Sequence, residues 1–147
     1  MTSSTPSTPP RRKRPTSVNY FALAVLYLGA VNLARAWLAM DGGGLAATLP
    51  LAMPLTYLAA GGLAWGGVFV AAALGVWRLW PWARRLILAA IVLYQLHIWV
   101  NHLVFDTSDY ARQVWPLHIG ISVAWVAAVW GYMALPGIRR LWREREH

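Results

Sequence analysis

Four long stretches of the chain are almost continuously apolar, and polar segments separate them. Each holds 22 to 24 residues, and about 20 apolar residues suffice for a helix to cross the hydrocarbon core of a bilayer. The pattern therefore predicts four transmembrane helices, at about residues 18–40, 54–77, 84–105 and 114–135. The expected fold is an all-α integral membrane protein, an antiparallel four-helix transmembrane bundle spanning residues 18–135.

The segments outside the spans are polar. Residues 1–17 are rich in Ser, Thr and Pro and carry a basic cluster at Arg11–Arg14, a composition that predicts a disordered tail. Residues 136–147 form a basic C-terminal tail in which a short interfacial helix is expected, and a short interfacial segment is expected at 45–49. Ala34-Arg35-Ala36 fits a signal cleavage site, but the preceding apolar run exceeds the roughly 7–15 residues of a signal sequence, so an uncleaved anchor is expected.

Basic residues lie mostly on one side of the predicted spans. The N-terminal tail holds four, the turn at 78–85 holds three and the C-terminal tail holds four, which makes eleven of the thirteen. By the positive-inside rule both termini are cytoplasmic. The predicted location is the plasma (inner) membrane, with anionic headgroups attracting the basic tails.

Composition supports the membrane class. Hydrophobic residues make up 59% of the chain, mean hydropathy is +0.46, and only 12% of residues are charged, about half the share found in soluble domains. The net charge of +8 lies beside membrane segments, so no nucleic-acid partner is expected. The absence of cysteine excludes disulfides and Cys-based zinc or iron–sulfur sites.

The second span carries glycines at helical spacing. Gly62 and Gly66 form a G-x-x-x-G pair, and Gly67, Ala71 and Gly75 extend a second ridge of small residues. Such ridges let membrane helices approach closely. We expect them to pack within the bundle, with a homo-oligomer contact as the alternative.

The turn after this span has its own signature, Gly75-x-Trp77-Arg78 followed by Pro81-Trp82-Ala83-Arg84. Cations in the headgroups and indoles at their boundary anchor a membrane protein at one interface. This turn resembles the G-x-W-R…P-W-A-R turns of many small bacterial membrane proteins of unassigned function.

Polar side chains gather on one half of the third span, which is expected to face the bundle. The hairpin of the third and fourth spans brings His118 to the same level, and the end of the first span reaches a similar depth. Ionisable groups at membrane depth are candidates for function. The predicted polar site comprises Asn32, Arg35, His97, Asn101, His102, Asp106 and His118.

These side chains admit several chemistries. They can form structural hydrogen bonds between helices, with Arg35 paired to Asp106 or Asp109. Alternatively, His118 with His97 or His102 could bind haem b, or less favourably copper or zinc. No Asp or Glu lies inside any span, which weighs against a proton-coupled transporter.

No motif of a hydrolase, phosphate loop or metalloprotease is present, so an enzyme is not favoured. The expected function is that of a non-enzymatic accessory or assembly component, acting through helix packing with another membrane protein. The alternatives are a haem b (or metal) protein and a small-molecule transporter.

Overall fold

The computed structural model describes residues 15–41, 53–105 and 109–143, and its regular structure there is entirely helical. Four of these helices are long and apolar enough to cross a membrane, which confirms an all-helical chain with four candidate spans. The N-terminal tail as far as residue 14, the segment at 45–49 and Asp106 lie outside the described residues. The helices are α1 (Thr16–Met40), α3 (Leu55–Arg78), α4 (Pro81–Phe105), α5 (Asp109–Ala134) and α6 (Pro136–Arg143).

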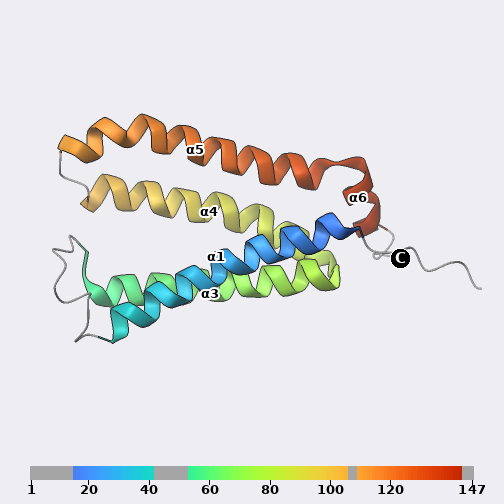
Figure 1. Ribbon diagram of the computed structural model, residues 1–147, viewed down its shortest axis with the longest axis horizontal. Coiled ribbons are helices and arrows are strands. Elements are labelled where there is room, and N and C mark those ends of the chain that lie inside the picture. The colour runs from blue at the N-terminus through green and yellow to red at the C-terminus, as the bar shows by residue number, and fades with distance from the viewer. Residues whose placement is uncertain (1–14, 42–52, 106–108, 144–147) are drawn as a thin grey trace, which may run out of the picture.

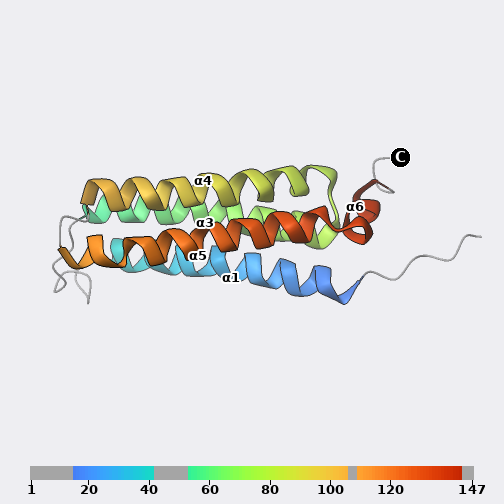
Figure 2. The same cartoon turned by 90° about the horizontal axis from the view of Figure 1, so that it is seen from above.

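Successive long helices run in opposite directions (Figures 1 and 2). The start of α1, the turn between α3 and α4, and α6 lie together at one end, called here the α6 end. The end of α1, the start of α3, the end of α4 and the start of α5 lie at the opposite end, called here the far end. Helix α1 packs most extensively on α3, and α4 lies against both α3 and α5.

The contact between α1 and α3 is made by small side chains. The buried residues of α1 recur at alternating spacings of four and three, as in Val18, Ala22, Val25, Gly29, Asn32, Ala36 and Ala39. Those of α3 include Ala59, Gly62, Gly66, Phe69, Ala73 and Val76. A repeat of 3.5 residues keeps one stripe of a helix facing its partner along its length. We call this contact the α1–α3 seam.

The glycines show how close the two backbones come. A Cβ added at Gly62 would lie 2.7 Å from the carbonyl oxygen of Asn32, and one at Gly29 would lie 3.1 Å from the backbone nitrogen of Val70. A Cβ at Gly66 would lie 3.1 Å from the backbone nitrogen of Leu33 and 2.6 Å from its side chain. A Cβ at Gly67, in contrast, would have no neighbour within 4 Å among the described residues.

A tight turn joins α3 to α4. Leu79 adopts the left-handed conformation (φ 56°), and the N–H groups of Leu79 and Trp80 donate to the carbonyls of Val76 and Gly75, the pattern of a Schellman motif. Leucine in this conformation costs about 1–2 kcal/mol, which burial of its side chain offsets. The guanidinium of Arg78 lies 5.2 Å from the centre of the Trp80 ring, consistent with the cation–aromatic anchor expected at this turn.

Helix α5 begins at Asp109, about five residues before the predicted start of the fourth span. A helix that began at residue 114 would hold Pro116 in its first turn. Because α5 begins at Asp109, Pro116 lies inside the helix instead. After α5, helix α6 folds back so that Ile138 and Trp142 are buried with Met133. The hydrophobic core, with Phe69 and Ile87 fully enclosed, thus lies toward the α6 end, and polar groups occupy the far half.

Candidate functional site

A cavity of about 260 Å³ lies between α1, α3 and α4 in the far half of the molecule. It reaches the far end, because Met53, just before α3, is part of its wall. Polar and aromatic side chains form most of the lining, which consists of Asn32, Arg35, Met53, Tyr57, Leu58, Gly61, Gly62, Trp65, Tyr94, His97, Ile98, Asn101 and His102. We call it the polar cavity.

Most of the residues predicted for the polar site line this one cavity: Asn32, Arg35, His97, Asn101 and His102. His118 does not line it and instead contacts His102 from α5. Asp106 lies outside the described residues.

The lining residues that were not predicted include Tyr57, Gly61 and Trp65 of α3. They follow one another at intervals of four, so they share one face of the helix. The sequence signal for this wall of the cavity was a glycine flanked by two aromatic residues at this spacing. Glycine has no side chain and therefore leaves an open space between the two aromatic rings.

One hydrogen-bond chain crosses the cavity from α3 to α4. The hydroxyl of Tyr57 donates to Oδ1 of Asn101 at 2.6 Å, and Nδ2 of Asn101 lies 3.1 Å from Nε2 of His97. Since the amide oxygen of Asn101 accepts from Tyr57, its nitrogen donates to His97. Neutral His97 then accepts at Nε2 and carries its proton on Nδ1. The chain holds the imidazole in one orientation.

A second set of hydrogen bonds joins α1 to α4. Asn32 is only 4% exposed. Its Nδ2 donates to the carbonyl oxygen of Leu28 at 2.8 Å, and its Oδ1 accepts from the hydroxyl of Tyr94 at 3.3 Å. Both ends of this buried amide therefore have partners, as a polar group away from water requires.

Aromatic rings form the floor of the cavity. The ring of Trp65 meets Tyr94 edge-on at 5.2 Å between centroids and lies 5.8 Å from His97. Tyr94 in turn meets Phe69 edge-on at 5.1 Å, at the border of the core. These ring contacts join the polar lining of the cavity to the packed core and so limit the movement of the lining.

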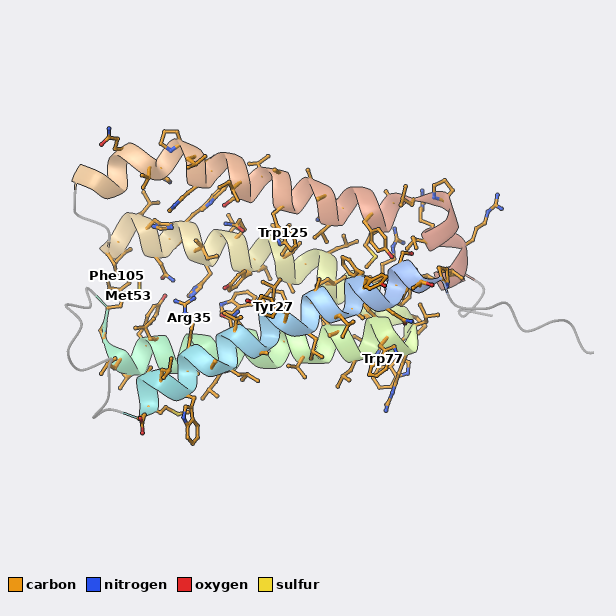
Figure 3. All side chains as sticks on the ribbon, viewed as in Figure 1. Tyr27, Arg35, Met53, Trp77, Phe105 and Trp125 are labelled. Atoms are coloured by element: carbon orange, nitrogen blue, oxygen red, sulfur yellow. The ribbon has the colours of Figure 1, made fainter. Side chains whose placement is uncertain are left out.

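Arg35 brings a positive charge to the cavity. It lies three residues after Asn32, on a neighbouring part of the same face of α1, and it lies between α1 and α4, toward the end marked by Met53 and Phe105 (Figure 3). Within the part of the chain that the structure describes, Arg35 has no carboxylate partner. The pairing predicted with Asp106 or Asp109 involves side chains outside that part.

A second cavity, of about 280 Å³, lies between α4 and α5 and shares Tyr94, Ile98 and His102 with the first. There the rings of His102 and His118 lie 5.4 Å apart, and Nε2 of Gln95 donates to Oγ of Ser122. His102 thus separates the two cavities. Among the described residues no group of three or more His, Cys, Asp or Glu side chains could hold a metal ion.

Comparisons of this chain with protein-family models, with curated proteins and with solved structures found no match. The groups of the site offer hydrogen-bond donors and acceptors, a cation and aromatic surfaces, all of which can bind a ligand.

Proposed function

We propose that the chain is a non-enzymatic accessory component of the plasma membrane, with four spans, both termini in the cytoplasm, and α5 as the helix that contacts a second membrane protein. The orientation is supported by charge. Arg78, Arg84 and Arg85 lie at the α6 end with the exposed Arg139 and Arg140, and basic residues are retained on the cytoplasmic side of a membrane.

The observation that carries the accessory role is the outward face of α5. Only 11% of its most apolar stretch is buried within the chain, against 39% for α3. A ridge of exposed small residues runs along that face, comprising Gly120, Ala124, Ala127, Ala128 and Gly131. A Cβ added at Gly120 or Gly131 would have no neighbour within 4 Å among the described residues.

The α1–α3 seam shows how this chain uses such ridges. Lipid tails are as apolar as leucine, so membrane helices associate through close contact of small residues and not through a hydrophobic driving force. In the seam, Gly29, Gly62 and Gly66 each approach the partner helix closely. The α5 ridge has the same character without a partner inside the chain, and another transmembrane helix is the occupant that fits it.

Native mass tests this proposal. The tagged chain is expressed at its native level and released gently from its own membrane. Extra mass the size of another protein is expected for the unchanged chain and is lost in Gly131→Leu, whose side chain would hold the second helix away. Gly67→Leu is the matched control, because Gly67 also faces open space but on α3, and it keeps the extra mass. A mass equal to the bare chain, or to a simple multiple of it, overturns the accessory role.

One observation favours a second candidate, a haem b or metal protein. His102 and His118 come from different helices and their rings are in contact, and neutral imidazole is a good ligand for iron. A visible absorption spectrum of the purified chain tests it. A haem band that disappears in His118→Ala while the protein stays folded would support haem binding, and a colourless preparation from haem-replete cells would refute haem binding.

A further inference from the structure

No residue of α5 lines the polar cavity, and the charge of the cavity comes from Arg35. Guanidinium stays protonated in proteins, so this side of the cavity is permanently positive. Arg35 lies five residues before the end of α1, which is about 7.5 Å of helix. This depth is shallow enough for a small molecule or a headgroup at the membrane surface to reach the charge.

The hydrogen bonds inside the cavity leave Arg35 as the strongest donor for a ligand. Tyr57 and Tyr94 already donate to Asn101 and Asn32, so their hydroxyl protons are engaged. No carboxylate partner of Arg35 is present among the described residues. Because carboxylate and phosphate match the guanidinium fork and accept two parallel N–H bonds, an oxyanion is the chemical group that fits here.

The rest of the wall limits what can be attached to the oxyanion. Trp65 supplies a flat apolar surface beside His97. Gly61 leaves the wall open next to the imidazole ring of His97, because an added Cβ at Gly61 would lie 3.7 Å from Nε2 of His97. The volume of 260 Å³ equals roughly eight or nine water molecules at about 30 Å³ each, so the cavity takes a small ring or a headgroup but not a whole lipid.

We propose that the polar cavity binds an oxyanion, a carboxylate or a phosphate, through Arg35, with the remainder of the ligand against Trp65. Two sources share this chemistry: a free small anion and the headgroup of an anionic lipid. Arg35 supplies the charge and the paired donors. Asn32, His97 and Asn101 form a wall that their mutual hydrogen bonds and the aromatic floor keep in place.

The test uses the full chain in detergent and two kinds of probe. Benzoate and inorganic phosphate represent free anions and are followed by the thermal unfolding midpoint. An equimolar mixture of dioleoylphosphatidylglycerol and dioleoylphosphatidylcholine represents lipids and is followed by native mass spectrometry. The variant is Arg35→Gln, and the matched control is Arg140→Gln, which removes one exposed charge at the α6 end.

If the source is a free anion, benzoate or phosphate raises the midpoint of the unchanged chain and of Arg140→Gln, but not that of Arg35→Gln. If the source is a lipid, phosphatidylglycerol is retained over phosphatidylcholine by the same two proteins and at least tenfold less by Arg35→Gln, the size of effect expected for hydrogen bonds to a charged group. Either result supports the site.

A variant that leaves Arg35 in place keeps the test valid if Arg35→Gln fails to fold. Gly61→Leu places its first carbon in ordinary contact with His97 and fills the cavity with the rest. It is expected to lose binding as Arg35→Gln does, whereas Gly67→Leu, whose side chain points to open space, keeps it.

Two results would overturn the proposal. The first is that no probe shows binding that is lost in both Arg35→Gln and Gly61→Leu. The second is an equal loss of stability in Arg35→Gln and Asp106→Asn without any probe, because Arg35 would then be one half of a structural ion pair.

Discussion

Replacing Gly62 by alanine is the sharpest test of the α1–α3 seam. The new Cβ would lie 2.7 Å from the carbonyl oxygen of Asn32, 2.9 Å from Cβ of Ala36 and 3.0 Å from its backbone nitrogen. Two of these three atoms belong to the backbone of α1 and cannot turn away. Restoring an ordinary contact of 3.4 Å to the oxygen requires the helices to separate by about 0.7 Å at this point.

The expected cost follows from this clash. Forcing one extra carbon into a well-packed contact typically costs about 1–3 kcal/mol, which lowers the folding equilibrium constant roughly 5- to 150-fold. The same change at Gly67 is the matched control, since a Cβ there meets no described atom within 4 Å. Gly67→Ala is expected to be neutral or to gain up to about 1 kcal/mol from the better helix propensity of alanine.

Equilibrium unfolding in mixed micelles measures both variants. The fraction of dodecyl sulfate is raised, and loss of helix is followed by far-ultraviolet circular dichroism. Gly62→Ala should unfold at a lower fraction of dodecyl sulfate than the unchanged chain, and Gly67→Ala should not. Equal behaviour of the two alanine variants would refute the close approach of α1 and α3 at Gly62.

Two further predictions follow from the hydrogen bonds and the orientation. Tyr57→Phe removes the donor to Asn101 and should lower the free energy of unfolding by about 0.6–2 kcal/mol. Tyr132→Phe should be neutral or stabilising, because the buried hydroxyl of Tyr132 has no hydrogen-bond partner among the described residues. The micelle assay separates the two variants, and an equal loss in both would contradict the assignment of the hydrogen bond from Tyr57 to Asn101. Because the chain has no cysteine, a cysteine introduced by Met40→Cys or Arg140→Cys reports on which side of the membrane that end of the molecule lies. A membrane-impermeant maleimide should label Met40→Cys in intact cells and Arg140→Cys only after permeabilisation. The reverse pattern would invert the proposed orientation.

The sequence predicted the helices well because hydropathy marks residues that can enter a membrane. The same property marks the apolar stretch of α5, which begins at Gln113, and not the start of the helix at Asp109. Its first turns, from Asp109 to Gln113, are helical but polar, and a helix does not have to end where its apolar stretch ends. Pro116 was therefore expected in a first turn that lies further upstream.

Glycine spacing could not identify which ridge of α3 meets another helix. Gly62 faces α1, Gly75 faces Ala83 of α4, and Gly67 faces open space, although all three belong to regular small-residue patterns. Spacing shows which residues share one face of a helix. Which neighbour that face meets depends on the position of the other helices, and a pattern within one span carries no information about that position. For the same reason the predicted depth brought His118 level with His102, whose ring it contacts, but could not show that His118 lies outside the polar cavity.

Asn32 connects the seam to the polar cavity. It occupies a buried position of the 3.5-residue repeat on α1, where a polar residue is costly but can fix the register between two helices. Its side chain also accepts from Tyr94 of α4, and its backbone oxygen is the atom that a Cβ at Gly62 would meet. A shift of α1 along α3 would therefore move Arg35, one turn further on, relative to His97 and Asn101. Consequently Gly62→Ala, which displaces α1 at Asn32, should weaken ligand binding in the cavity as well as the fold, while Gly67→Ala should leave ligand binding unchanged and should not weaken the fold.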